Sequence, residues 1–491
     1  MFQIPVKGEG KAEVLQRIRD LQEADVSWKE GRTWSMVYYI DEDHLQLIKE
    51  AYGAYLSENF LNPFAFHGLR KMEEELIRMG VSLLNGDEQS TGTMTSGGTE
   101  SIFLAVYAYR QRARALRPRI KAPEMVAPAS IHPAFDKACH LLGIKLRKAP
   151  LAQDFRADPR QMERLINANT ILLAASSPSY PHGLLDPIEA IADIALRRGL
   201  PMHVDACIGG FMLPWVERLG ASLPPWDFRV NGVTSMSADL HKFGYAAKGA
   251  SLILYREPEF LKYQFYVATD WPGGIYASTT MLGTRPGGAV SAAWAAMMAL
   301  GQEGYLRVAG EIMEGVARLK TALAGMEDLE VIGEPVMNIV AFTTRRNQPD
   351  IFVVADQLEA RGWVVDRQQS PNCLHLTLMR YNIPVLDQYA ADLKEALDFA
   401  RNNPRAVSQG NAAMYGLMAR IPFRGVVEKN VRRLFEELYN FSSVMRVSDS
   451  PQTSSKDHSS FNPAPWIGKL NRFLTGWFAF KTWLKGKKIK E

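Results

Sequence analysis

Residues 170–206 read TILLAASSPSYPHGLLDPIEAIADIALRRGLPMHVDA. Two short apolar runs, TILLAA and PMHVDA, flank a helical pattern that begins near Pro187 and ends before Gly199. The apolar stripe of this helix consists of Ile188, Ile191, Ala192 and Ala195. A strand, a crossover helix and a second strand predict a parallel β-sheet with helices on both faces.

The same alternation extends to both sides of this segment, with further apolar runs near residues 125, 144 and 250. A helix around 306–325, two strand-like stretches and a helix near 386–402 follow and predict a smaller α+β domain. We therefore divide the chain into a helical N-terminal segment (1–94), a large α/β domain (95–305), a small C-terminal domain (306–445), a Ser- and Pro-rich linker (446–465) and a basic tail (466–491).

Composition excludes several classes of protein. The chain has 491 residues, of which 47% are hydrophobic and 22% charged, which is typical of a globular protein and not of a disordered one. A net charge of +4 is too small for a dedicated nucleic-acid binder. The three cysteines are widely spaced and predict neither disulfides nor a metal site. Without a signal-peptide pattern or a long apolar stretch, we expect a cytoplasmic protein.

Residues 95–101, TSGGTES, predict a binding site for a phosphate group. A glycine pair, Gly97 and Gly98, precedes an apolar helical pattern. Backbone N–H groups at such a helix start can close around an anion, and the helix dipole adds attraction. The alternative for this motif alone is a capped helix after a tight turn.

Two further motifs give this phosphate site a chemical context. Asp205 follows a short strand, where ligands of open α/β sheets bind, and a carboxylate there can hold a protonated pyridine nitrogen. Lys242 lies between His241 and Phe243, and we expect burial to lower its pKa so that the amine can bind an aldehyde. Taken alone, Asp205 could be an ordinary helix cap and Lys242 an ordinary surface charge. Together the three motifs predict a site for pyridoxal 5'-phosphate (PLP).

The sequence resembles the PLP-dependent sphingosine-1-phosphate lyases, within the group II amino-acid decarboxylase-like family, from about Trp28 to Tyr439. The residues that carry the resemblance include GLRKME (68–73), TSGGTES (95–101), HVDACIGGF (203–211), DFRVNGVTSMSADLHKFGYAAKGASLILY (227–255), DWPGGIYAS (270–278), RPGG (285–288) and AAMYGLM (412–418). It implies the fold-type I architecture of aspartate aminotransferase, with a large, mainly parallel sheet domain and a smaller α+β domain. It also implies a homodimer whose active site lies between the subunits.

The resemblance also implies the roles of the cofactor-binding residues. Lys242 would bind PLP covalently, Asp205 would pair with the ring nitrogen and His132 would stack on the ring. The residues implied to hold the phosphate are Gly98, Thr99, Ser237 and His241, with Gly288 from the partner chain. No metal is implied.

For the substrate, the resemblance implies a phosphorylated, amphiphilic amino alcohol in a pocket with Tyr38, Lys248 and Tyr415. Tyr415 would orient or deprotonate the reacting hydroxyl. The chain departs from the family at Asn62, which replaces a phosphate-contacting histidine, so we expect weaker phosphate binding or a different head group. We also expect Trp34 and Met36 to narrow or reshape the pocket.

These parts predict a retro-aldol lyase that breaks C2–C3 of sphingosine 1-phosphate or a related base and releases a long-chain aldehyde and phosphoethanolamine. PLP motifs alone do not separate this activity from amino-acid decarboxylation, which is the first alternative. A protein that has lost catalysis and acts as a membrane-bound scaffold is the second. The retained Lys242, Asp205 and His132 argue against the scaffold.

The tail, residues 466–491, carries seven Lys and Arg residues and one Glu, hence a net charge of +6, while the rest of the chain sums to −2. Its aromatic and aliphatic residues recur at helical spacing. Such a helix fits a peripheral anchor at the inner face of a membrane. The alternative is that it packs on the body or on a partner subunit.

Overall fold

The computed structural model describes residues 3–23, 25–62, 64–404, 406 and 424–440. The chain divides into two compact units. The first consists of Met1–Ala322, Val331–Ala341 and His375–Tyr389, and the second of Leu323–Glu330, Phe342–Leu374 and Ala390–Glu491. The predicted linker, the tail and Tyr415 lie outside the described residues.

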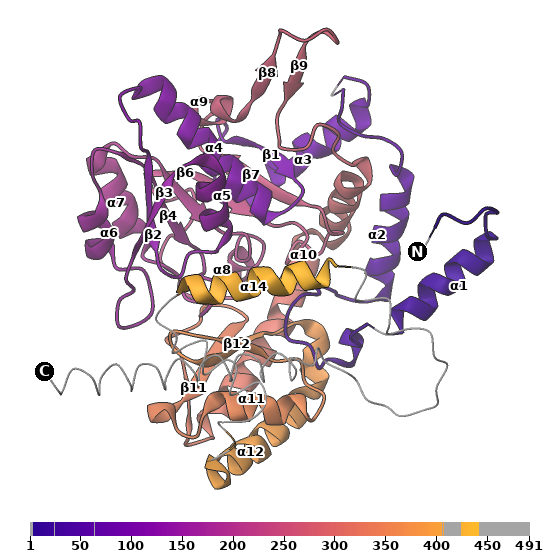
Figure 1. Cartoon of the computed structure of the whole chain (residues 1–491), viewed down its shortest axis with the longest axis vertical. Helices are drawn as coiled ribbons and strands as arrows, with labels where there is room; N and C mark the ends of the chain where they lie inside the picture. Colours follow the sequence, from indigo (N-terminus) through magenta and orange to yellow (C-terminus); the bar gives the residue numbers. More distant parts are fainter. Residues whose placement is uncertain (1–2, 24, 63, 405, 407–423, 441–491) are drawn as a thin grey trace, which may run out of the picture. The chain divides into compact units, whose positions relative to one another are not determined.

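A seven-stranded sheet forms the centre of the first unit (Figure 1). Its strands, in spatial order, are β1 (Thr91–Thr95), β7 (Ser251–Tyr255), β6 (Val233–Ala238), β5 (Met202–Asp205), β4 (Thr170–Ser176), β2 (Glu124–Pro128) and β3 (Lys145–Ala149). Only β7 runs antiparallel to its neighbours. The prediction of a large, mainly parallel sheet is therefore confirmed.

Helices cover this sheet because each one turns an apolar stripe toward it. Helices α4 (Gly98–Leu116) and α5 (Ala134–Leu142) pack together over it in one buried cluster with Ile102, Phe135 and Leu172. Helix α7 (Ile188–Arg198) begins after Pro187 and ends at Gly199, whose φ of 62° suits glycine. It buries the predicted stripe, so its bounds and orientation are confirmed.

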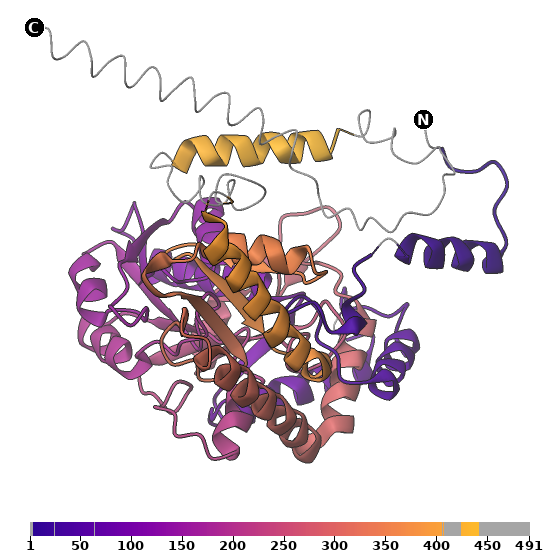
Figure 2. The ribbon, with the colours of Figure 1, turned by 90° about the horizontal axis from the view of Figure 1, so that it is seen from below.

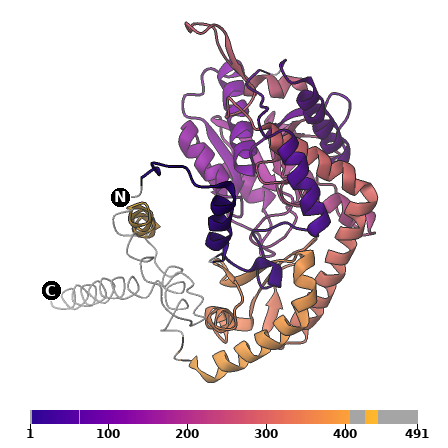
Figure 3. The ribbon, with the colours of Figure 1, turned by 90° about the vertical axis from the view of Figure 1, so that its right-hand side faces the viewer.

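The first unit has further helices. They are α1 (Lys11–Gln22), α2 (Glu42–Ala54), α3 (His67–Leu83), α6 (Pro159–Leu165), α8 (Leu213–Arg218), α9 (Pro258–Leu261) and α10 (Gly287–Ala324), with 3₁₀ turns at Trp28–Glu30, Lys262–Gln264 and Arg380–Val385. Of these helices, α6 and α8 connect parallel strands of the sheet. A hairpin of β8 (Tyr266–Ala268) and β9 (Tyr276–Ser278) projects from the sheet (Figure 1). Helix α10 is kinked at Gly301, and the part after the kink corresponds to the helix predicted around 306–325 (Figure 3).

A second sheet has four strands, in the order β10 (Leu329–Val331), β11 (Ile339–Thr344), β13 (Cys373–Thr377) and β12 (Asp366–Gln368). Each strand-like stretch that we predicted thus holds two strands. The accompanying helices are α11 (Ile351–Glu359), α12 (Leu386–Asn402) and α14 (Arg424–Leu438), with a 3₁₀ turn at Arg345–Asn347. Helix α12 has the predicted bounds and lies along these strands (Figure 2). Among the described helices, none is both long and apolar enough to cross a bilayer.

Candidate active site

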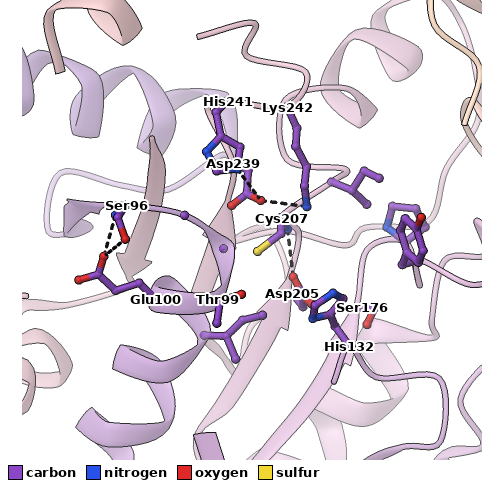
Figure 4. Close-up of a pocket in the computed structure, with 16 residues that line it drawn as sticks. Ser96, Thr99, Glu100, His132, Ser176, Asp205, Cys207, Asp239, His241 and Lys242 are labelled. Atoms are coloured by element: carbon purple, nitrogen blue, oxygen red, sulfur yellow. Dashed lines mark hydrogen bonds and ion pairs between the residues drawn. The ribbon is translucent and has the colours of Figure 1, made fainter. Parts of the chain in front are cut away.

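A cavity of about 440 Å³ lies in the first unit, where β5 ends and α4 begins (Figure 4). Its volume is within the usual range for a small-molecule site. Chemically active side chains converge on it from several loops. They include Ser96, Thr99, Glu100, His132, Ser176, Asp205, Cys207, Asp239, His241 and Lys242.

The glycine loop at the start of α4 forms one wall of the cavity. A Cβ atom on Gly98 would lie 2.7 Å from the Cys207 sulfur and 2.8 Å from both Asp239 carboxylate oxygens, so no larger residue fits. Ser96 donates its backbone N–H and its hydroxyl to Glu100 Oε2, at 2.7 and 2.6 Å. Because these bonds fix the loop at a helix N-terminus, its remaining N–H groups can bind a phosphate group.

Asp205 is the last residue of β5 and is buried at the cavity wall. Its Oδ1 accepts hydrogen bonds from the backbone N–H of Cys207, at 3.1 Å, and from the hydroxyl of Ser237, at 3.2 Å. No described residue hydrogen-bonds to its Oδ2. One carboxylate oxygen is therefore fixed by the protein while the other remains available to a donor on a ligand.

Lys242 lies opposite, with its amine 2.9 Å from Asp239 Oδ2. Burial is the largest single effect and opposes the charge on this amine, but the attraction of Asp239 and of neighbouring groups together exceeds it and raises the pKa of Lys242. Our prediction of a lowered pKa is wrong, because it considered burial and overlooked the acid three residues earlier. The other oxygen of Asp239 is buried and has no hydrogen-bond partner among the described residues.

His241 and Lys248 connect this cavity to a second one. His241 Nδ1 accepts N–H bonds from Gly249 and Ala250, so the ring proton of neutral His241 lies on Nε2, which is 3.6 Å from Asp239. Lys248 donates to the His241 carbonyl oxygen at 3.3 Å, and its amine lies 4.8 Å from the Tyr38 ring centre. Burial, followed by the charge of Lys242, lowers the pKa of Lys248. Tyr38 and Lys248 line the second cavity, also of about 440 Å³.

The structure brings six of the predicted site residues to the first cavity: Gly98, Thr99, His132, Asp205, His241 and Lys242. Ser237 is adjacent, but it is not among the residues lining the cavity, and its hydroxyl bonds to Asp205. Gly288 packs against Tyr52 at the start of α10. Asn62 lies in an exposed turn, where its Oδ1 accepts from the N–H of Phe64 at 2.9 Å.

Two pocket residues that we predicted from the family departures lie elsewhere. Trp34 is buried with its ring 4.5 Å from that of Tyr389, and Met36 is 56% exposed with a φ of 75°. Neither lines one of the two cavities described above, so their effect on the substrate pocket stays a prediction.

Several residues that line the cavity escaped the sequence reasoning: Ser96, Glu100, Ser176, Tyr180, Cys207 and Asp239. For Glu100 a signal existed, since an acid four residues after a serine at a helix start can bind back to it. Asp239 lies three residues before Lys242 in the sequence, close enough to form an ion pair with it. Ser176 ends β4 as Asp205 ends β5, so the strand-end signal applied to it as well. No comparable signal marked Tyr180, which lies in the loop after β4.

These residues fit pyridoxal phosphate. The glycine loop suits its phosphate, the open oxygen of Asp205 suits its ring nitrogen, and Lys242 supplies an amine for its aldehyde. In the described part of the chain no three His, Cys, Asp or Glu side chains group as metal ligands.

Comparison with known proteins identifies the family. Residues 69–345 match the pyridoxal-dependent decarboxylase conserved domain. The chain is 41% identical to mouse sphingosine-1-phosphate lyase 1 over 84% of its own length and 73% of that protein. A probable L-aspartate decarboxylase of Pyrococcus abyssi is 33% identical over 81% of the chain and its own full length. The solved Burkholderia pseudomallei sphingosine-1-phosphate lyase superposes with a TM-score of 0.79 at 38% identity, covering 83% of this chain and 95% of that one.

The cavity and the comparisons agree on the cofactor. The matched domain spans the glycine loop, Asp205 and Lys242, the three elements that fit PLP. The similarity to lyases also extends beyond that domain over most of the chain. The chain belongs to the pyridoxal-dependent decarboxylase family and, within it, to the PLP-dependent sphingosine-1-phosphate lyases.

Proposed function

We propose that the chain is an aldehyde-lyase that cleaves the C2–C3 bond of sphingosine 1-phosphate or a related phosphorylated long-chain base. The products are a long-chain aldehyde and phosphoethanolamine. The observation that carries this proposal is the convergence of Lys242, Asp205 and the glycine loop on one cavity, in a chain 41% identical to a mouse lyase of this kind.

The residues of the cavity divide the work of binding the cofactor. Gly98 and Thr99 would hold its phosphate, Asp205 its ring nitrogen, and Lys242 its aldehyde carbon, with His132 at the ring face. When bound, PLP withdraws electrons from the carbon that bears the substrate amine. The protein selects the bond that breaks by fixing the substrate orientation.

Lys248 and Tyr38 supply the polar contacts of the second cavity, which we assign to the substrate. Burial lowers the pKa of the Lys248 amine, and a phosphate group beside it would stabilise the charged form and accept a charge-assisted hydrogen bond. We assign removal of the C3 hydroxyl proton to Tyr415, on the family resemblance alone. Breaking C2–C3 then turns the hydroxyl carbon into the aldehyde, and C2 takes up a proton to complete phosphoethanolamine.

We further propose a homodimer in which Gly288 and Asn62 serve the site of the partner subunit. This fits the observation that neither residue lines the two cavities described above. Light scattering of the purified protein should give twice the chain mass of 55.0 kDa, and a monomer with full activity would contradict the proposal.

The tail supports a proposed peripheral membrane contact of a cytoplasmic enzyme, because it combines a net charge of +6 with apolar residues at helical spacing. Deleting residues 446–491 should abolish binding to anionic vesicles and leave turnover of a short-chain soluble substrate intact. Unchanged vesicle binding would favour packing of the tail on the protein.

Product analysis tests the main proposal. Incubation with sphingosine 1-phosphate should release aldehyde and phosphoethanolamine, whereas carbon dioxide from an amino acid would favour a decarboxylase. Lys242→Ala should lose both turnover and the near-visible absorbance of the lysine-bound cofactor. Lys262→Ala, which removes an exposed lysine paired with Glu259, is the control and should retain both. Wild-type protein without that absorbance would favour the scaffold alternative.

A further inference from the structure

A buried line of hydrogen bonds leads away from Asp205 into the core. Ser237 Oγ lies 3.2 Å from Asp205 Oδ1 and 3.3 Å from His203 Nε2. His203 Nδ1 is 2.8 Å from Ser235 Oγ, which is 2.8 Å from the Tyr109 hydroxyl. We call these residues, Tyr109, Ser235, His203, Ser237 and Asp205, the hydrogen-bond chain.

Strand register builds this arrangement. On neighbouring strands β5 and β6, His203 pairs with Ser235 and Asp205 pairs with Ser237. Residues two apart on a strand point to the same face of a sheet, so all four side chains lie on one face. Tyr109 reaches them from α4, the helix whose first turn forms the glycine loop.

The direction of every hydrogen bond follows from its end. An ionised carboxylate only accepts, so Ser237 donates to Asp205. The Ser237 oxygen then accepts from His203 Nε2–H, which leaves Nδ1 to accept from Ser235, and Ser235 accepts from Tyr109. Because the Tyr109 hydroxyl has one proton, its contact with Thr234 Oγ1 at 2.7 Å is one in which Thr234 donates. Burial lowers the pKa of His203 to about 4, so the ring is neutral and has one donor and one acceptor, as this order requires.

The hydrogen-bond chain is enclosed by apolar side chains. His203 and Ser235 are buried completely and Tyr109 almost so, and the Phe135 ring centre lies 5.8 Å from that of His203. None of these three residues lines the cavity. In such surroundings each hydrogen bond strengthens the next, and a broken one leaves a buried polar group unpaired.

We propose that His203, Ser235 and Tyr109 are positioning residues that act through Ser237 on Asp205 and keep the proton shared with the cofactor on its ring nitrogen. Donors aimed at a carboxylate stabilise its ionised form. They also fix Oδ1, which leaves Oδ2 available to a ring bound in the cavity that Asp205 lines. The proposal rests on PLP binding and not on the identity of the substrate.

The test uses holoenzyme loaded with PLP labelled with ¹⁵N in the ring, whose chemical shift reports protonation of that nitrogen across pH. In His203→Phe we expect the protonation midpoint to fall by about one pH unit, the size of one lost hydrogen bond to a charged group. We expect kcat to fall about tenfold and KM to change less than about twofold, since the substrate does not touch His203.

Paired variants separate positioning from simple packing. His203→Gln can keep an N–H near the Nε2 position and should restore most of the ¹⁵N midpoint. Tyr109→Phe should shift it in the same direction by a smaller amount. Tyr255→Phe is the matched control, because it removes a buried hydroxyl that bonds to Gln264 and not to the hydrogen-bond chain, and it should shift nothing.

A wild-type ¹⁵N midpoint in folded His203→Phe holoenzyme would overturn the proposal, whatever its kcat. If that variant does not fold, Tyr109→Phe and Ser235→Ala decide, and an unchanged midpoint in both would overturn it. The two proposals can fail separately. If the variants shift the ¹⁵N midpoint as expected but the wild-type enzyme releases no aldehyde, the proposed substrate is refuted and this inference stands.

Discussion

Replacing Asp239 with asparagine should release the Lys242 amine from its ion pair. At the 2.9 Å that separates Nζ from Oδ2, an effective dielectric constant of about 20 gives an attraction of about 6 kcal/mol, or about four pKa units. The asparagine amide still offers an acceptor oxygen, so we expect about half of this effect. The pKa of Lys242 in cofactor-free protein should therefore fall by about two units.

The rate of covalent PLP attachment to cofactor-free protein, followed by absorbance, measures this change because only the neutral amine attacks the aldehyde. Below both pKa values the variant should react about 100-fold faster than wild type, and its rate should level off at lower pH. Glu259→Gln is the control and should keep the wild-type profile, since it removes a carboxylate that pairs with Lys262 and does not line the cavity. Superimposable pH profiles for Asp239→Asn and wild type would refute the reasoning.

Three further predictions concern the glycine loop, the buried core and the substrate site. Gly98→Ala should weaken PLP binding by more than about tenfold, because its Cβ would lie 2.7 Å from the Cys207 sulfur; an unchanged Kd from fluorescence titration would contradict this. Burial lowers the pKa of His182 to about 4, so between pH 6.5 and 4 the unfolded chain takes up a proton that the native state refuses, and native stability falls by up to about 3 kcal/mol. His182→Phe should remove this loss, and urea unfolding showing an equal loss from pH 7 to 4.5 in both proteins would count against it. Asn62→His should change KM and keep the cofactor absorbance, whereas loss of cofactor would show that Asn62 is misassigned.

Local patterns predict those parts of the fold that local physics determines. Helix α7 has the predicted bounds because Pro187 and Gly199 fix its two ends, and the apolar runs become strands because helices bury both of their faces. The direction of β7 was not predictable in this way, since an apolar run such as ASLILY is the same in a parallel and an antiparallel neighbour. The chain path around it sets the direction.

The candidate site also has a part that local motifs predict and a part that only the tertiary structure determines. Motif reasoning identifies Gly98, Asp205 and Lys242, because each lies in a short segment whose residue types limit its chemistry. It missed the charge of Asp239 beside Lys242. The family resemblance implies a phosphate contact for Ser237, whereas the pairing of β5 with β6 brings its hydroxyl to Asp205. Such contacts depend on strand register and loop closure, which no single motif contains.

Helix α4 supports both ends of the cofactor site at once. Its first residue, Gly98, belongs to the phosphate cradle, and Tyr109 lies eleven residues later, about 16 Å along the axis. Because rise and rotation per residue are fixed in an α-helix, this spacing fixes the distance and the angle between the glycine loop and the Tyr109–Ser235 contact. One residue inserted midway would swing Tyr109 about 100° away from Ser235 and leave the cradle untouched. Insertions or deletions within this helix between Gly98 and Tyr109 should therefore be tolerated only in whole helical turns.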